Sequence, residues 1–155
     1  MVGSPWQTMA NLLEDLAFIR ELQPQMIGIG PFIPHHATPF KNYPAGTLEQ
    51  TLTLLSVLRL MFPKVLLPAT TALGTIVPNG RELGILAGAN VVMPNLSPAD
   101  VRQNYLLYDN KLCSGAEAAE AKNDLAARLH SIGYEIAEAA VIIRSPENAS
   151  KSIKS

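Results

Sequence analysis

Cysteine is almost absent from this sequence, in which Cys113 is the single representative. One thiol cannot form a disulfide within the chain, and it cannot build a metal site that needs several thiolates. We therefore expect a reducing, cytoplasmic location and no metal site formed by this chain.

Charge is also sparse, because charged residues make up 16% of the sequence, against about a quarter in ordinary soluble domains. The formal net charge of -1 offers no cluster of Lys and Arg for nucleic acid. The longest apolar runs, near Val65–Ala69 and Val91–Met93, are far shorter than the roughly 20 residues that cross a membrane. These absences predict neither a nucleic-acid partner nor a membrane partner. The hydrophobic content of 48% indicates a chain that covers much of its surface with another partner.

The 155 residues alternate short β-type runs with longer segments of helical period. Strands are predicted at Met26–Gly30, Val65–Pro68 and Val91–Pro94, with a short one at Met1–Gly3. Because each run is followed by a loop and a helix, the pattern predicts an α/β fold with a parallel sheet. A closed (β/α)8 barrel needs twice as many strands, so two architectures are open: a small open α/β domain, or the second half of a barrel.

Capping residues mark the predicted helices. Ser4-Pro5-Trp6-Gln7 has the pattern of a helix start, with Ser as N-cap and Gln three residues later. The apolar face of that helix is predicted to consist of Met9, Leu12, Leu13, Leu16 and Ile19. Further helices are predicted after Thr47, over Arg81–Ala87, after Ser97 and from Ser114 to Gly133, whereas Ala69–Pro78 is predicted to be a loop.

The segment Gly28-Ile29-Gly30-Pro31-Phe32-Ile33-Pro34-His35 ends the first complete strand. Two glycines at the C-terminal end of a strand let backbone approach a ligand, and α/β folds keep their sites at that end. A third glycine and a following helix are missing, so this is no dinucleotide-binding fingerprint, and a structural turn is the favoured interpretation. His35 and His36 are interpreted as solvated loop side chains, because neighbours on an extended segment point in opposite directions and suit one metal ion poorly.

Thr70 and Thr71 follow the next strand and are expected at the same end of the sheet as Gly28 and Gly30. Two hydroxyls with free backbone N–H groups can hold a small anion or a carboxylate, and bonding to their own turn is an equal alternative.

Other candidates follow further along the chain. Met93 ends the third strand, where a thioether is usually core filler, and Tyr105 and Tyr108 share a helix face, where they could bind a ligand or pack at an edge.

Four segments, in this order, resemble the radical S-adenosylmethionine (SAM) enzymes of the FeFe-hydrogenase maturase (HydE) type. They are Gly28–His35 with Thr38-Pro39, Leu66–Gly74, Gly88–Asn95 and Tyr105–Tyr108. The resemblance runs from about Met1 to about Gly133. Biotin synthase and methylornithine synthase are similar as well and form the alternative within this class.

The resemblance implies a fold, a chemistry and a set of site residues. Members are (β/α)8 barrels with a C-terminal extension, and they cleave SAM reductively at a 4Fe–4S cluster to give a 5′-deoxyadenosyl radical. In the maturase, this radical serves assembly of the di-iron subcluster of the hydrogenase. By matching motif, Met26, Tyr105 and Leu107 would lie around SAM. Thr70, Thr71 and Met93 would line the substrate or anion pocket, with Tyr108 as the candidate catalytic residue.

One feature of the family is missing, because its cluster is held by a C-x3-C-x2-C motif that this chain lacks. The resemblance therefore implies the C-terminal half of such an enzyme, a partial (β/α)8 barrel that is inactive alone. Expected partners are the missing N-terminal barrel half, in the same or a separate chain, a small-molecule substrate and the hydrogenase maturation machinery.

The expected domains are the barrel half at 1–95, an extension that closes the barrel at 96–143 and a disordered tail at 144–155. A function of another class is also open. The chain could be a non-catalytic module that binds a small anion or an adenosine-like ligand near Gly28, Thr70 and Tyr105, or one half of a split barrel.

Overall fold

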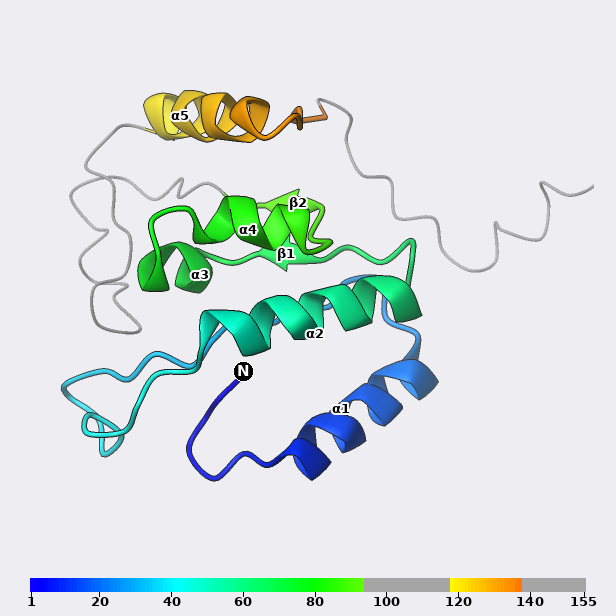
Figure 1. Cartoon of the computed structure of the whole chain (residues 1–155), viewed down its shortest axis with the longest axis vertical. Coiled ribbons are helices and arrows are strands. Elements are labelled where there is room, and N and C mark those ends of the chain that lie inside the picture. Colours follow the sequence, from blue (N-terminus) through cyan, green and yellow to red (C-terminus); the bar gives the residue numbers. More distant parts are fainter. Residues whose placement is uncertain (94–117, 138–155) are drawn as a thin grey trace, which may run out of the picture.

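A computed structural model describes residues 1–93 and 118–137 of the chain (Figure 1). In these ranges the helices are α1 (Met9–Leu22), α2 (Leu48–Met61), α3 (Thr71–Ile76), α4 (Gly80–Leu86) and α5 (Ala118–Ser131), and the strands are β1 (Pro68–Ala69) and β2 (Val91–Val92). The helix predicted after Ser97 and the tail predicted at 144–155 lie outside the described residues. Within the described ranges, no helix has the length and apolar character needed to cross a membrane.

Extended segments pair in parallel, as the sequence predicts. β1 and β2 form a parallel pair, with Pro68 opposite Val91. Two single parallel bridges extend this order, one between Met26 and Leu66 and one between Val2 and Pro31. The four segments therefore lie side by side in chain order, and a helix follows each of the first three. The α/β organisation is thus confirmed, although the strands are much shorter than predicted.

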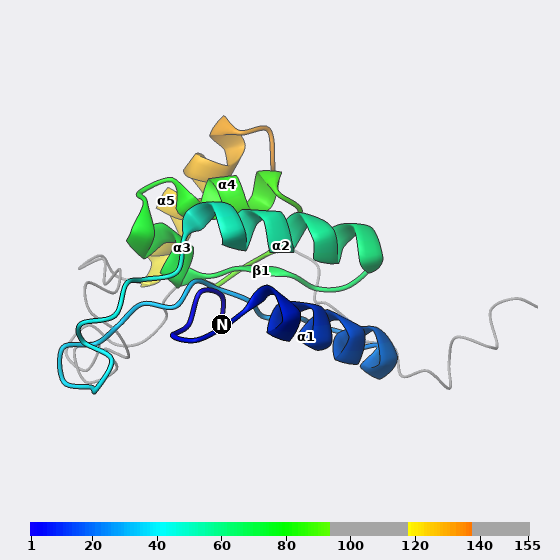
Figure 2. The ribbon, with the colours of Figure 1, turned by 60° about the horizontal axis from the view of Figure 1, so that its bottom comes forward.

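The helices lie in chain order along the long axis of the molecule, from α1 through α2 and α4 to α5 (Figures 1 and 2). One hydrophobic core joins α2, α3, α4 and α5 to the extended segments. Its buried members are Ile27, Leu55, Leu58, Phe62, Val65, Leu67, Ala69, Leu73, Ile85, Ala89, Leu125 and Leu129. By contrast, α1 has no buried residue: Leu16 and Ile19 pack against the core half-buried, and Met9 and Leu13 are exposed.

The predicted start of the first helix at Ser4 is wrong. α1 begins at Met9, and Thr8 is its N-cap in a capping box with Asn11. Residues 4–7 instead form a turn in which Trp6 has a left-handed φ of 63°. The side chain of Gln7 bonds to the backbone of the preceding extended segment and does not cap the helix.

The predicted caps at Thr47 and Gly133 are confirmed. At the start of α2, the Gln50 N–H donates to Thr47 Oγ1 at 3.2 Å. Beyond α5, Gly133 has a φ of 83°, and the Tyr134 N–H donates to the Leu129 carbonyl at 3.0 Å. Local capping chemistry therefore fixes both helix ends.

The loop predicted over Ala69–Pro78 is wrong, because it contains α3. This helix is short, and burial of Ala72 and Leu73 in the core accounts for it better than intrinsic propensity does. The first residue of α4, Gly80, is packed so closely on α3 that a Cβ there would lie 2.0 Å from the Leu73 carbonyl oxygen. A glycine is thus required where α4 begins.

Arg59, near the end of α2, holds the turn that follows it. Its Nε donates to the Gly88 carbonyl at 2.8 Å. Its Nη1 donates to the carbonyls of Phe62, Pro63 and Val65 at 3.2, 2.9 and 3.0 Å. One guanidinium therefore satisfies carbonyl groups at the end of a helix, where the helix itself supplies no donors.

Candidate functional site

A hollow of about 440 Å³ opens where the extended segments end. Its walls come from the loop after Met26 and from the residues that follow β1. The lining consists of Met1, Gly28, Gly30, Pro31, Phe32, Ile33, His35, Thr38, Phe40, Thr70, Thr71 and Ala72. The structure thus brings the glycine-rich segment and the Thr70-Thr71 pair together, as their places at strand ends predict.

Thr70 contributes a hydroxyl that has no partner within the protein. The residue occupies the N-cap position of α3 with extended backbone, yet its side chain makes no capping hydrogen bond. Oγ1 is buried and without a hydrogen-bond partner. Leaving such a group unpaired costs about 1–3 kcal/mol, and a hydroxyl can both donate and accept. Thr70 Oγ1 is therefore an uncompensated polar group in the wall of the hollow.

Gly30 makes room for this hydroxyl. A Cβ on Gly30 would lie 2.7 Å from Thr70 Oγ1, which is closer than real Cβ contacts. Gly28, two residues earlier, has no atom within 4 Å of the place where its Cβ would be. Only the second glycine is therefore required by close packing, and it fixes the distance between the two walls of the hollow.

His35 is a lining residue that sequence reasoning missed. It is half-buried and stacks on the exposed ring of His36, with ring centroids 4.4 Å apart. The Ala37 N–H donates to His35 Nδ1 at 3.1 Å, so the neutral ring carries its proton on Nε2. His36 is exposed as predicted, but His35 belongs to the wall of the hollow. Its place three residues before Thr38 in a proline-rich loop did not indicate this.

The other predicted site residues divide into two groups. Met26 and Met93 are 43% and 50% exposed and lie outside the lining of this hollow. Tyr105, Leu107 and Tyr108 lie outside the described residues, as does Cys113. Across residues 1–93 and 118–137, no group of three or more His, Cys, Asp or Glu side chains could hold a metal ion.

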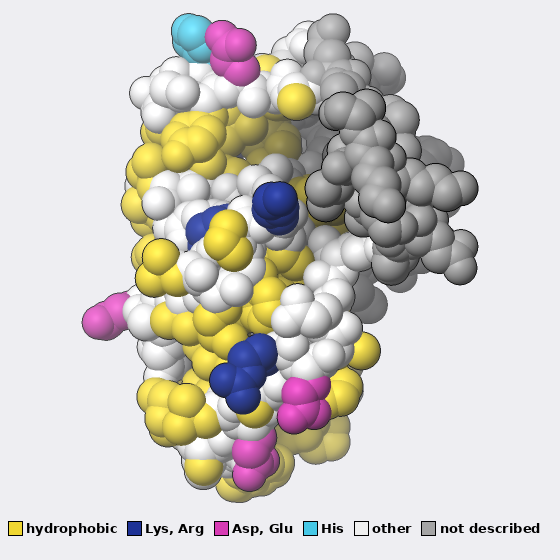
Figure 3. All heavy atoms as spheres, turned by 90° about the vertical axis from the view of Figure 1, so that its right-hand side faces the viewer, with side chains coloured by type: hydrophobic (Ala, Val, Ile, Leu, Met, Phe, Trp, Pro, Cys, Tyr) yellow, Lys and Arg dark blue, Asp and Glu magenta, His cyan; other side chains and the backbone are white. Residues whose placement is uncertain are grey.

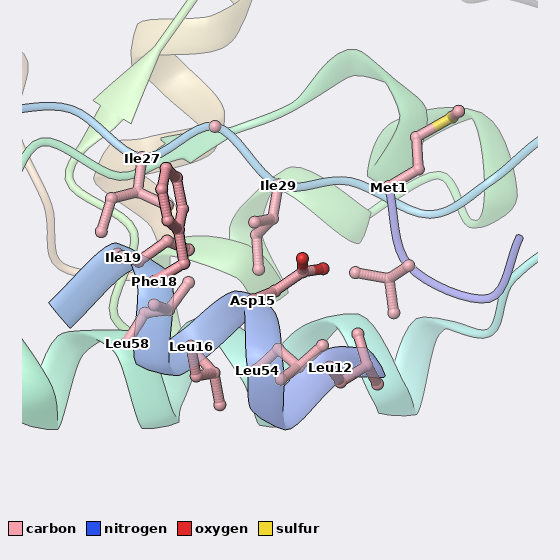
Figure 4. Close-up of a pocket in the computed structure, with 12 residues that line it drawn as sticks. Met1, Leu12, Asp15, Leu16, Phe18, Ile19, Ile27, Ile29, Leu54 and Leu58 are labelled. Carbon is pink, nitrogen blue, oxygen red and sulfur yellow. The ribbon is translucent and has the colours of Figure 1, made fainter. Parts of the chain in front are cut away.

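A second cavity, of about 260 Å³, lies between α1, α2 and the extended segment at Ile27–Ile29 (Figure 4). Its lining is almost entirely aliphatic, with Phe18 at one end. Asp15 supplies the one carboxylate of that lining and points toward the gap between Ile29 and Met1. The cavity lacks the convergent polar groups of the hollow at Thr70, and it shows that α1 is loosely packed on the rest of the chain.

Comparison with known proteins identifies relatives over part of the chain. The [FeFe] hydrogenase maturase subunit HydE of Thermotoga maritima is 50% identical over 113 residues, which are 73% of this chain and 32% of that protein. The 3-methylornithine synthase of Methanosarcina barkeri is 37% identical over 89 residues, or 57% of this chain and 25% of the synthase. The Methanosarcina acetivorans 3-methylornithine synthase is 28% identical over 102 residues, which are 66% of this chain and 29% of the synthase.

No family model matches the chain. The chain spans about a third of the HydE relative and less of the two synthases. It is thus a homologue of a hydrogenase maturase subunit and of methylornithine synthases, with the similarity confined to one part of those proteins.

Proposed function

Starting from this homology, we propose that the chain is the C-terminal, substrate-side part of a radical SAM enzyme that acts in FeFe-hydrogenase maturation. The identity of 50% with HydE over 113 residues favours this reaction over that of the methylornithine synthases, which are less similar. In this proposal the parallel segments of the sheet are the last strands of a (β/α)8 barrel, and the hollow at Thr70 opens at its carboxyl end.

The observation that carries the proposal is the unpaired Thr70 hydroxyl. Together with Thr71 and the Nε2–H of His35, it lines the hollow with groups that donate hydrogen bonds. Carboxylates and small anions accept such bonds, so the proposed ligand is the carboxylate or anionic group of a small substrate. In this role Thr70 and Thr71 orient the substrate, and Gly30 keeps the space between the walls open.

The remaining site residues are assigned through the resemblance alone. Met26, Tyr105 and Leu107 are proposed to surround SAM, and Met93 is proposed to line the substrate pocket with the threonines. Tyr108 is proposed as the catalytic residue, a phenol beside the reacting atoms.

The residues of this chain do not fit an iron–sulfur cluster. Such a cluster needs several thiolates, and the sequence contains one cysteine. In this proposal another part of the enzyme would hold the cluster, which would supply the electron for reductive cleavage of SAM. The proposed partners are therefore an N-terminal barrel half with the cluster and the hydrogenase maturation machinery.

The proposal is tested by measuring 5′-deoxyadenosine after iron and sulfide reconstitution. The chain alone should form none. It should form 5′-deoxyadenosine when it is combined with a polypeptide that contains the region of Thermotoga maritima HydE outside the 113 matched residues. Product from the chain alone would contradict the proposed division of roles, and so would a stable, reconstituted complex without product.

Thr70→Val tests the role of the hydroxyl in the active complex. Loss of one hydrogen bond to the substrate should raise the substrate KM about tenfold, while cleavage of SAM without substrate is retained. Thr53→Val, the same change at an exposed position of α2, is the control and should leave KM unchanged. Equal KM values for the two variants would refute the role of Thr70.

A further inference from the structure

Trp6 lies in a strained turn on the surface of the molecule. Its φ of 63° is in the left-handed region, which is unfavourable for a residue with a bulky side chain. The residue is 74% exposed, so burial in the core does not compensate for this conformation. A backbone of this kind persists only where the surrounding structure stabilises it, and the compensation must come from the contacts of the Trp6 ring.

Those contacts are made with the loop of residues 31–46. The Trp6 ring meets the Tyr43 ring edge-to-face at a centroid distance of 5.3 Å and the Phe40 ring at 6.1 Å. Phe40 and Tyr43 also contact each other, at 5.9 Å. Edge-to-face contact is a favoured geometry of aromatic pairs and stabilises them beyond the burial of their surface. The three rings therefore join the turn at Trp6 to the loop.

The loop is closed at its base and protrudes beside the start of α2 (Figures 1 and 2). The Gly46 N–H donates to the Phe32 carbonyl at 2.8 Å, and three further backbone bonds join residues between His35 and Tyr43 to one another. This is the form of a compact Ω-loop. These bonds shape the loop but do not attach its outer part to another element, whereas the contact with Trp6 does.

The same loop forms one wall of the hollow at Thr70. Phe40 lines the hollow, and its ring lies 6.2 Å from that of Phe32, a buried residue of the lining. His35 and Thr38 line the hollow from this loop as well. Trp6 contacts Phe40 from outside the lining. A displacement of the Trp6 ring therefore reaches the hollow through Phe40.

Exposure alone does not single out Trp6. Hydrophobic side chains also lie between a few charged ones on the face of the molecule that is turned away from the loop (Figure 3). Leu60 on α2 is 81% exposed, which is more than Trp6. Trp6 differs by combining a left-handed backbone with ring contacts to a wall of the hollow.

We propose that Trp6 is a positioning residue for the hollow: its ring keeps the loop of residues 31–46 in place, and the hollow then retains an anionic ligand more tightly. When the contact opens, the turn at Trp6 can relax. The strain that is relieved and the ring contacts that are lost are of similar size, so the open and docked loops lie close in free energy. Such a loop opens to admit a ligand and closes to retain it. The anionic ligand rests on the proposed function, whereas the placement of the loop rests on the ring contacts.

The experiment uses the whole chain with benzoate as the probe, because benzoate joins a carboxylate for the threonines to an aromatic ring for Phe32 and Phe40. If the docked loop strengthens ligand binding, the ligand must strengthen docking by the same factor. Trp6 is the single tryptophan of the chain, so its indole N–H gives one NMR signal whose position depends on the neighbouring rings. Saturating benzoate should shift this signal and raise the ratio of docked to open loop about threefold.

Trp6→Gly removes the ring and suits the left-handed backbone, so this variant keeps the fold. NMR relaxation should show the amide order parameters of Lys41 and Tyr43 falling from about 0.85 to below about 0.6. The Kd of benzoate, followed at the Thr71 amide, should rise about threefold. Trp6→Phe keeps an aromatic ring and should restore most of both properties. Leu60→Ala, at the more exposed position on α2, is the control and should change neither.

Each opposite result overturns a defined part of the proposal. Unchanged order parameters in Trp6→Gly would show that the ring does not keep the loop in place, and an unchanged Kd would show that the loop does not affect the hollow. Trp6→Phe behaving like Trp6→Gly would refute the aromatic contact as the cause. No benzoate shift at Thr71 in the original chain would refute the anion site of the proposed function, and the order parameters would still decide whether Trp6 positions the loop.

Discussion

Arg128 on α5 forms a bidentate ion pair with Glu82 on α4, although the two residues are 46 positions apart in the sequence. Nε of Arg128 donates to one carboxylate oxygen of Glu82, and Nη2 donates to the other at 2.9 Å. Nη2 also donates to the Pro78 carbonyl. Because Glu82 is 7% exposed, its carboxylate depends on this partner, and the pair fixes α5 to α4 beside the buried Leu125 and Leu129.

Arg128→Ala should lower the free energy of unfolding by about 2 kcal/mol, since it leaves a buried carboxylate without its cation. The loss is smaller than for a fully buried pair because the Arg128 side chain is 36% exposed. Urea unfolding measures it, with the exposed Arg20→Ala on α1 as the control, expected within about 0.5 kcal/mol of the original chain. Adding Glu82→Gln to Arg128→Ala should recover part of the loss, and an equal or greater loss in the double variant would contradict the assignment.

Gly30→Ala should destabilise the chain by about 1–3 kcal/mol, because its new Cβ overlaps Thr70 Oγ1. Gly28→Ala is the matched control and meets open space, so it should change stability by less than about 0.5 kcal/mol. Removing the opposing atom with Thr70→Ala should restore part of the stability of Gly30→Ala. Thermal unfolding of the four variants checks this, and additive losses in the double variant would show that the two residues do not oppose each other.

Trp6 combines a left-handed backbone with aromatic contacts, its ring lying 5.3 Å from that of Tyr43 and 6.1 Å from that of Phe40. Both Trp6→Ala and Trp6→Gly remove these contacts, but only glycine relieves the backbone strain. Trp6→Gly should therefore be more stable than Trp6→Ala by about 1 kcal/mol. Ala17→Gly, at an exposed position inside α1, should show the opposite sign and lose about 1 kcal/mol. Chemical unfolding gives both differences, and a less stable Trp6→Gly would mean that the turn carries no strain.

Helix ends were predictable wherever a cap is made by neighbouring residues, as at Thr47 and Gly133. The pattern at Ser4-Pro5-Trp6-Gln7 satisfied the same rules, yet in the structure the Gln7 side chain bonds to the backbone of Met1 and Gly3. A choice between a helix cap and a strand edge depends on tertiary pairing, which no local pattern contains. The short helix α3 was missed for a related reason, since it depends on burial of Leu73 in the core.

The part of the candidate site that directly follows the strands could be predicted from the sequence. Thr70 and Gly30 were expected near each other because both follow parallel strands, and the hollow contains both. Their close contact, and the absence of a cap bond at Thr70, depend on ångström-scale packing between segments remote in sequence. His35 was interpreted as solvated because two adjacent histidines on an extended segment suit one metal ion poorly. The sequence does not reveal the fold of Pro31–Gly46 that places it in the wall of the hollow.

Arg59 shows how strongly a side chain that bonds to four carbonyl groups restricts the variation of a sequence. Its guanidinium serves carbonyls of Phe62, Pro63, Val65 and Gly88 from a single plane, and the Cβ expected for any larger residue at Gly88 would lie 2.7 Å from the Arg59 Cβ. A lysine would present one compact ammonium to acceptors spread along that plane, so it cannot replace this geometry. Arg59 and Gly88 therefore form a pair in which neither member tolerates its usual conservative exchange, and natural variation at one should follow the other.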